Sequence, residues 1–297
     1  MKISLVVLNY NDSSTTINLL NKVKHYRIID NLIVVDNCST DQSFQILNSY
    51  AKSVEESITV IKTDKNGGYA YGNNYGCYYA LNNCNSEYLV VANPDIYFEE
   101  NTLRKIINVY KDKTDAAIVS CLMNCTSDIN LPSAWKLPRY CDCILENLLI
   151  LRKIVGNRTR YEESKLKGLI NNVDVIAGSF FVIPGNVFDM IKGFDNSTFL
   201  YYEENILAYK LKKMGYSNYL VGNVYYDHLH SVSINKAFST IKKRLDLSFE
   251  SRRIYVVKYL KVSLIKKKIF EITYYMGRLN YLAVKKIIDK ISVFWRK

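Results

Sequence analysis

The chain has 297 residues, which is enough for one large domain or for one domain with an appendage. Apolar residues make up 48% of it and only 4 residues are Pro, so a disordered chain is excluded. The formal net charge is +12, and all of the excess lies in residues 239–297, which hold 16 Lys and Arg against 4 Asp and Glu. We therefore expect a neutral body and a tail that binds anions.

The cysteine pattern argues against metal clusters and disulfides. The 7 cysteines are odd in number and include no Cys-x₂-Cys pair, and the chain has only 3 histidines. A reducing, cytoplasmic environment fits this usage. The apolar run Ile3–Leu8 is too short for a signal peptide and is typical of a first strand. No run of about 18 uncharged apolar residues occurs, so no membrane-spanning helix is predicted.

Strands and helices are expected to alternate through the first part of the chain. The pattern predicts buried strands at 3–8, 32–36, 57–62, 87–93 and 116–123. Helices are expected between them, at 14–26, from 41, from a Gly/Asn-rich loop to 82, and from 100 to 111. This alternation predicts an α/β fold with a mostly parallel open sheet flanked by helices.

The later elements are less regular. Residues 124–172 are interpreted as a flexible segment that covers a substrate. The elements expected after it are a strand pair at 173–183 around Gly178, a short helix with Pro184 at its first position, a helix from Glu203 to about Met214, and an extended segment at 219–226. We expect two domains, a body at 1–238 and a basic, amphipathic helical tail at 239–297.

Polar residues follow four successive strands of the predicted sheet. Right-handed crossovers place the carboxyl ends of these strands at one edge, where open α/β sheets bind ligands. The segments at these ends are Asn9–Asn11, Asp36–Asn37, Asn66–Gly68 and Asn93–Asp95. Asp95 offers one carboxylate to a divalent cation, which would take further oxygens from a phosphate. A simple strand-terminal turn is the alternative for the Asn-Pro-Asp sequence.

Taken in order, these motifs resemble family 2 of the nucleotide-sugar glycosyltransferases, which have the GT-A fold, and most closely its rhamnosyltransferase-like branch. The resemblance covers about residues 1–235. It is carried by Val7-Leu8-Asn9-Tyr10-Asn11, Val34-Val35-Asp36-Asn37-Cys38-Ser39-Thr40-Asp41, Asn66-Gly67-Gly68 with Asn73 and Gly76, Asn93-Pro94-Asp95-Ile96, Gly178-Ser179, Gly193-Phe194-Asp195, Phe199-Leu200-Tyr201-Tyr202-Glu203-Glu204, and His228 with Ser233.

The resemblance implies an inverting transferase that moves a sugar, with rhamnose among the candidates, from a dTDP- or UDP-linked donor. The implied acceptor is a saccharide carried on a lipid, in the synthesis of a surface polysaccharide. A divalent cation, Mg²⁺ or Mn²⁺, would be held by Asp95 and by His228, with His230 as a competitor for that role. The donor-binding residues implied are Asn9, Tyr10, Asn11, Asp36, Asn37, Asn66, Gly67, Gly68, Asn73 and Asn93.

The resemblance places the general base in the pair Glu203-Glu204, with Glu204 at the catalytic position. Two carboxylates at a helix start are alternatively simple complements to the helix dipole. Four positions depart from the pattern: Asn93 replaces an acid, Glu204 is one methylene longer than the Asp of relatives, and Ile206 and Gly185 replace an acidic residue and an Arg. The last two departures keep open a catalytically weak or inactive homologue that binds a glycan or a nucleotide.

Two other classes are disfavoured. A dinucleotide-binding oxidoreductase would carry Gly-x-Gly-x-x-Gly after its first strand, where this chain has Asn9-Tyr10-Asn11-Asp12. A nucleic-acid-binding protein is disfavoured by the neutral body and by the lack of a known motif, so no nucleic-acid partner is expected.

The tail carries a predicted apolar stripe with lysines largely off it. The stripe consists of Val284, Ile287, Ile288, Ile291 and Trp295, at helical spacing. A basic amphipathic helix of this kind lies in the interface of an anionic membrane, here the inner face of the plasma membrane. Packing of the stripe on the body or on a second subunit, as in a homo-oligomer, is the alternative.

Overall fold

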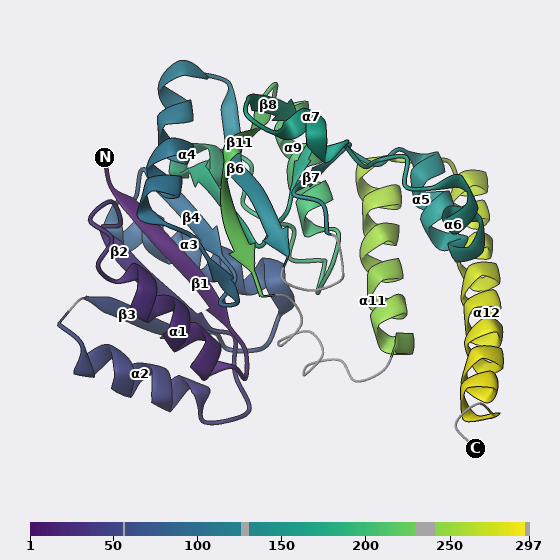
Figure 1. Ribbon diagram of the computed structural model, residues 1–297, viewed down its shortest axis with the longest axis horizontal. Helices are drawn as coiled ribbons and strands as arrows, with labels where there is room; N and C mark the ends of the chain where they lie inside the picture. Colours follow the sequence, from purple (N-terminus) through teal and green to yellow (C-terminus); the bar gives the residue numbers. More distant parts are fainter. Residues whose placement is uncertain (56, 126–130, 230–240, 295–297) are drawn as a thin grey trace.

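The computed structural model describes residues 1–55, 57–125, 131–229 and 241–294 (Figure 1). Strands and helices alternate in its first part because short β-branched runs end at Asn, Asp and Gly residues. The elements are β1 (Ile3–Asn9), α1 (Ser13–Val23), β2 (Asn31–Asp36), α2 (Ser43–Ser53), β3 (Ile58–Lys62), α3 (Gly68–Cys84), β4 (Tyr88–Ala92), β5 (Ile96–Tyr97), α4 (Glu100–Asp112) and β6 (Ala116–Cys125).

The second part contains more structure than expected. Its elements are β7 (Ala134–Trp135), α5 (Tyr140–Asn147), α6 (Leu149–Val155), α7 (Glu163–Leu166), β8 (Ile170–Val173), β9 (Val175–Ile176), β10 (Phe180–Pro184), α8 (Gly185–Met190), α9 (Glu203–Lys213), β11 (Ser217–His228), α11 (Ile241–Ile254), the π-helix η1 (Tyr255–Tyr259) and α12 (Leu264–Phe294). Pro184 is the N-cap of α8 rather than its first helical residue.

Within the described residues, nine strands form one sheet, in the order β3-β2-β1-β4-β10-β6-β11-β5, with β8 paired to β11. Strands β1 to β4 are mutually parallel where they pair, and β6 is parallel to β11. Strands β10, β5 and β8 run antiparallel to their neighbours. The predicted α/β fold with a mostly parallel sheet is therefore confirmed.

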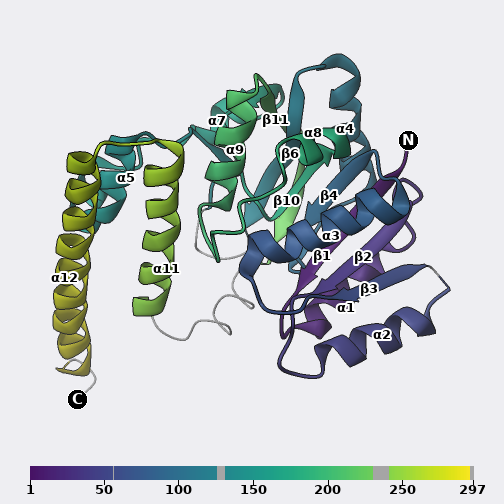
Figure 2. The ribbon, with the colours of Figure 1, turned by 180° about the vertical axis from the view of Figure 1, so that it is seen from behind.

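Helices cover both faces of the sheet, as Figures 1 and 2 show. Helices α1 and α4 pack their apolar stripes on one face, where they share a core with β1, β4 and β6. Helices α3, α8 and α9 pack on the other face. Because both faces are covered, β1, β2 and β4 are largely apolar, and most of their polar residues lie at or near their ends.

The described part of 124–172, which was expected to be a flexible segment over the substrate, contains helices and short strands. Helices α5 and α6 lie beside α12, apart from the sheet (Figures 1 and 2). A buried cluster joins α5 to the tail and to α9, and it includes Cys143, Ile206, Phe249, Tyr255 and Phe270. The expectation of a flexible segment is therefore wrong for 140–147, because apolar side chains of α5 pack against the C-terminal helices.

The tail is helical, as predicted. Helix α12 extends to Phe294, but the side chains of the expected stripe beyond Val284 lie outside the described residues. In the part of the chain that the structure describes, no helix has both the length and the apolar composition needed to cross a bilayer.

Candidate active site

The carboxyl ends of β1 and β2 are joined by a buried hydrogen bond. Asn9 lies opposite Asp36 in the parallel register, and its Nδ2 donates to Asp36 Oδ2 at 3.0 Å. The other carboxylate oxygen, Oδ1, accepts the backbone N–H of Ser39 at 2.9 Å. Asn9 and Asp36 are fully buried. Asp36 therefore holds Asn9 and the loop after β2 in place, and its contact with a nucleotide stays a prediction.

Asn11 connects the first two strand-end loops. Its φ of 53° lies in the left-handed region, which Asn tolerates better than most residues. Its N–H donates to Ser39 Oγ at 2.9 Å, and its Oδ1 accepts the N–H of Thr40 at 2.8 Å. Tyr10, between Asn9 and Asn11, is half-buried, so part of its side chain is accessible at this edge.

The loop before α3 lies beside the end of β2. Asn37 Nδ2 donates to Asn66 Oδ1 and to the carbonyl oxygen of Gly68, both at 3.1 Å. Gly68 has φ 87°, and a Cβ there would lie 2.0 Å from the carbonyl oxygen of Phe199. Only glycine fits this position. Helix α3 therefore begins in contact with the segment that leads to Glu203.

Gly67 and Asn73 support the first turns of α3. A Cβ on Gly67 would lie 2.4 Å from Cγ of Tyr71. Asn73 is buried, and its Nδ2 donates to the carbonyl oxygen of Tyr69 at 3.0 Å. Its Oδ1 has no hydrogen-bond partner among the described residues. The structure thus places Asn73 inside the body, and its expected contact with a donor is untested.

Asp95 and His228 are brought together by the antiparallel pairing of β5 with β11. His228 lies opposite Ile96, and its Nε2 is 3.3 Å from Asp95 Oδ1. Both residues are 7% exposed. Two residues before Asp95, the backbone N–H of Asn93 donates to the carbonyl oxygen of Ser179 at 2.8 Å. The edge thus joins β4, β5, β11 and the loop before β10.

A divalent cation fits this pair of side chains. Two ligands at right angles, each about 2.1 Å from one cation, are about 3 Å apart, which is close to the observed separation. The imidazole favours a transition-metal ion such as Mn²⁺ over Mg²⁺. Among the described residues no group of three or more metal-ligating side chains occurs, so phosphate oxygens and water would complete the coordination. His230 lies outside the described residues.

Glu203 and Glu204 begin α9 and face the same edge. Glu204 lies against Gly178, since a Cβ on that glycine would be 2.7 Å from Glu204 Oε1. The carbonyl oxygen of Gly178 accepts the hydroxyl of Tyr69, from α3, at 2.6 Å. Glu203 is 3% exposed, and its Oε1 has no hydrogen-bond partner in the described part of the chain. A surface complement to the helix dipole would be solvated, so the dipole alone does not explain Glu203.

The environment raises the pKa of both carboxyl groups. For Glu203, burial and then repulsion by the Glu204 carboxylate hold the pKa well above its ordinary value. For Glu204, burial raises the pKa, although the N–H groups of Glu204 and Gly178 act in the opposite direction. A carboxylate with a raised pKa is a stronger base at neutral pH, which suits Glu204 to accept a proton.

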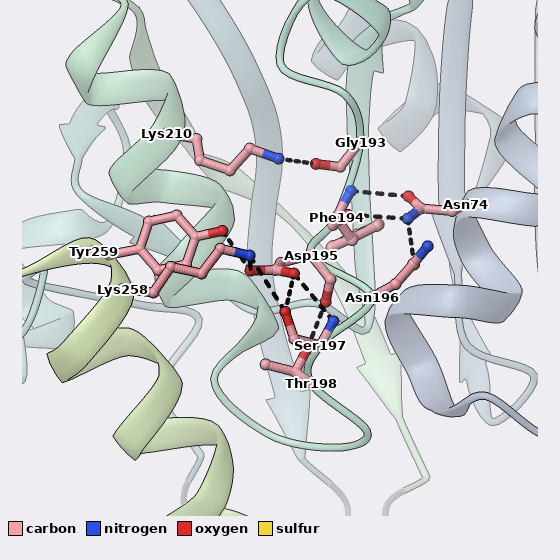
Figure 3. A network of polar contacts seen from close by, with 10 residues as sticks. All are labelled: Asn74, Gly193, Phe194, Asp195, Asn196, Ser197, Thr198, Lys210, Lys258 and Tyr259. Atoms are coloured by element: carbon pink, nitrogen blue, oxygen red, sulfur yellow. Dashed lines mark hydrogen bonds and ion pairs between the residues drawn. The ribbon is translucent and has the colours of Figure 1, made fainter.

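The loop between α8 and α9 is held from two sides (Figure 3). Asn74 of α3 donates Nδ2 to the carbonyl oxygen of Phe194 at 3.0 Å and accepts the N–H of Phe194 at 2.8 Å. On the other side, Asp195 accepts Lys258 Nζ at 2.7 Å and the Tyr259 hydroxyl at 2.5 Å, both from η1. Burial opposes ionisation of Asp195, but these hydrogen bonds hold its pKa well below the usual range.

Sequence reasoning missed the partners of Asp195. Asp195 was part of a motif with no role of its own, and Lys258 and Tyr259 had no predicted role. Asp195 directly follows Phe194, which packs in the core, and an acidic side chain close to a core is usually paired with a cation. The sequence does not identify Lys258 as that cation, because Lys258 lies 63 residues further along the chain.

The two departures at Ile206 and Gly185 have structural explanations. Ile206 is fully buried against the C-terminal helices, so its side chain packs in a core. Gly185 follows Pro184, which pairs with Tyr88 at the amino end of β4, and a Cβ there would lie 2.6 Å from the carbonyl oxygen of Ser86. Gly185 thus lies at the sheet edge opposite to the carboxyl ends of β1 and β4.

Known structures share this architecture. The chain is similar to mannosyltransferase PcManGT from Pyrobaculum calidifontis, solved with GDP-Man and Mn²⁺, with TM-score 0.59 and 16% identity over 92% of this chain and 69% of that one. It is also similar to GalNAc-T7, solved with UDP, GalNAc and Mn²⁺, with TM-score 0.63 and 14% identity over 92% of this chain and 54% of that one. The fold is thus that of the GT-A glycosyltransferases.

Sequence comparison defines the family. The family described as Glycosyl transferase family 2 matches residues 4–189. This is more than half of the chain, so the chain belongs to glycosyl transferase family 2. A curated relative is the low-salt glycan biosynthesis hexosyltransferase Agl10 of Haloferax volcanii, 24% identical over 251 residues, which cover 84% of this chain and 74% of Agl10.

Proposed function

We propose that this chain is an inverting, metal-dependent transferase that moves a hexosyl or rhamnosyl unit from a dTDP- or UDP-linked sugar to a saccharide acceptor. Family membership and the name of its relative Agl10 support glycosyl transfer. The observation that carries the proposal is a chain of contacts along one sheet edge. Asn93, beside Asp95, bonds to Ser179, and the adjacent Gly178 packs against Glu204.

The side chains at this edge suit the two chemical requirements of the reaction, which are stabilisation of the leaving group and deprotonation of the acceptor. Asp95 and His228 would hold a cation, which neutralises the negative charge that develops on a diphosphate leaving group. Glu204 would accept the proton of the acceptor hydroxyl as it attacks. Asn11, Asn66 and Gly67, which are partly exposed, would form the nucleotide side. The buried Asn9 and Asn37 would position them, with the Tyr10 ring available for stacking on the base.

The alternative, an inactive homologue that only binds a glycan or a nucleotide, has less support. It rested on Ile206 and Gly185, and both residues have packing roles away from the cation pair. The single methylene by which Glu204 exceeds an aspartate is accommodated beside Gly178, which has no side chain.

The proposal includes an acceptor carried on a lipid and docking on the inner face of an anionic membrane. Helix α12 exposes Leu264 and Ile265 by 78% and 73%, and α6 exposes Ile154 by 77%. Lys266–Lys268 follow immediately in the chain. Apolar side chains this exposed and flanked by cations are typical of a helix in the membrane interface.

The experiment is a panel of nucleoside-diphosphate sugars assayed with and without Mn²⁺. A true donor raises the melting temperature by binding the native state, and it is consumed when an acceptor extract is added. We expect one donor to do both, with Mn²⁺ required. Donor binding without hydrolysis or transfer would favour the inactive, nucleotide-binding alternative, and no binding by any donor would contradict the transferase proposal.

A further inference from the structure

A cavity of about 610 Å³ lies away from the candidate active site, where the loop after β7 meets α9 and the C-terminal helices. Tyr209 and Lys212 line it from α9. Glu203 begins the same helix, and a rise of 1.5 Å per residue places Lys212 about 13 Å further along the axis. None of the candidate active-site residues lines the cavity.

Hydrogen bonds between distant segments build the walls. The Tyr255 hydroxyl donates to the carbonyl oxygen of Pro138 at 2.9 Å, and the Tyr140 hydroxyl donates to the carbonyl oxygen of Lys266 at 2.7 Å. These bonds join the segment after β7 to η1 and α12. The cavity is therefore part of the junction between the sheet domain and the helices beside it, and its size is that of an ordinary ligand site.

The lining has an excess of positive charge. It contains two carboxylates, and both are engaged: Asp142 accepts the backbone N–H of Arg139 at 2.9 Å, and Asp174 accepts Lys212 Nζ at 2.8 Å and the N–H of Leu137 at 3.1 Å. The cationic side chains of the lining are Lys136, Arg139, Arg158, Lys212 and Lys266. Only Lys212 has a carboxylate within ion-pair distance among the described residues.

We propose that this cavity binds a phosphate-bearing ligand. Four of these cations have no carboxylate within ion-pair distance in the described part of the chain, although Lys136 and Lys266 lie over the rings of Tyr161 and Tyr140. Like charges around one cavity repel one another, and a multiply charged anion removes that repulsion. A guanidinium presents paired donors that match phosphate oxygens, and lysines add point charges around them. The remaining lining, which includes Leu137, Leu260 and the buried Tyr255, offers apolar surface to the part of the ligand that carries the phosphate.

The phosphate could belong to a soluble compound or to a lipid headgroup. The chemistry recognised is the same in both cases, and the cavity adjoins Lys266 at the start of α12, whose outer face is apolar. This inference does not depend on the transferase reaction proposed above, because it rests on residues that the reaction does not use.

The test is isothermal titration calorimetry of the full chain with inorganic pyrophosphate in EDTA. An Asp95→Ala background removes the cation-dependent donor site from the signal. We expect binding that weakens with salt and is reduced at least about tenfold in Arg139→Gln/Arg158→Gln, because charge-assisted hydrogen bonds are lost. The control, Lys52→Gln/Lys111→Gln, removes two exposed lysines elsewhere and should bind like the parent.

A second pair, Lys136→Gln/Lys266→Gln, guards against a folding defect, which circular dichroism would reveal. Vesicles of phosphatidylcholine with and without phosphatidylglycerol distinguish the ligand sources. A lipid headgroup is indicated if pyrophosphate competes with the anionic vesicles and the cavity variants bind them less. A soluble phosphate is indicated if only pyrophosphate binding is lost. Unchanged pyrophosphate binding in both folded cavity variants would overturn the proposal.

Discussion

The Asp195 carboxylate and the Lys258 ammonium form an ion pair, with 2.7 Å between Oδ2 and Nζ. Asp195 lies in the loop that leads to Glu203 and Glu204, and Lys258 lies in the π-helix η1 of the tail. The Ser251 hydroxyl reinforces this link by donating to the carbonyl oxygen of Leu200 at 2.9 Å. The C-terminal helices therefore hold the segment that presents the candidate general base.

We expect loss of this link to lower turnover more than donor affinity. Lys258→Met and Tyr259→Phe should each reduce kcat by about tenfold, because a loosened loop misplaces Glu204, while the donor Kd stays unchanged. Steady-state kinetics and donor titration measure the two effects. Lys261→Met, which removes an exposed lysine close by, is the control. A wild-type kcat in both variants would mean that the loop is held without the tail.

Asp95→Ala should abolish transfer while leaving the fold intact. Removing the carboxylate that would hold the cation costs several kcal/mol of transition-state stabilisation, equivalent to a loss of at least about 10³-fold in rate. EDTA should reproduce the loss in the wild type, and excess Mn²⁺ should restore activity only there. Near-wild-type activity of the variant in saturating Mn²⁺ would remove the metal role of Asp95.

Glu204→Gln should lower kcat by about 10²–10⁴, the usual contribution of a positioned general base. Donor affinity should change little, because the amide keeps the shape of the side chain and removes its basicity. Glu203→Gln is the matched comparison, one residue away. If Glu203→Gln is inactive and Glu204→Gln is active, the roles within the pair are reversed.

The raised pKa of Glu203 predicts a pH-dependent stability. The native state keeps a proton that the unfolded chain releases above the ordinary pKa of 4.5, so the free energy of unfolding falls as the pH rises above that value. Glu203→Gln should reduce this fall, leaving the part that Glu204 contributes, and should be more stable than the wild type at pH 8, with a smaller difference at pH 5. Urea denaturation at both pH values measures it, and a variant less stable at pH 8 than the wild type would contradict the burial argument.

Membrane docking predicts that the exposed face of α12 controls vesicle binding. Ile265→Ser/Ile272→Ser should reduce flotation with anionic vesicles at low salt, because both side chains are more than half exposed. Point variants are used because a chain that ended at Phe238 would also lose the contacts by which the tail holds the loop before Glu203. Leu169→Ser/Ile170→Ser changes exposed apolar residues at β8 and is the control. Equal flotation of all three proteins would exclude α12 as the docking face.

The sequence by itself determined the sheet edge where the candidate site lies. Asn9, Asp36, Asn66 and Asp95 each end or follow a short apolar run, and right-handed crossovers between parallel strands leave no choice of edge. Predicting the strands and the residues at their ends needs only the period of the apolar pattern and the residues that interrupt it. For that reason the α/β fold and the gathering of these strand-end residues at one edge could be predicted without coordinates, whereas the order of the strands in the sheet and the hydrogen bond from Asn9 to Asp36 came from the structure.

Local pattern did not reveal which distant residues complete that edge. His228 was placed with Asp95 only by the family resemblance, because their contact depends on antiparallel pairing of β5, a strand of only two residues that carries almost no periodic signal. Ile206 faces a core formed with α5 and the tail, so its apolar character follows from a surface that local pattern does not reveal. The same holds for Asp195 and Lys258. Such contacts depend on how finished elements pack against one another, and the packing is a property of whole surfaces rather than of short sequence windows.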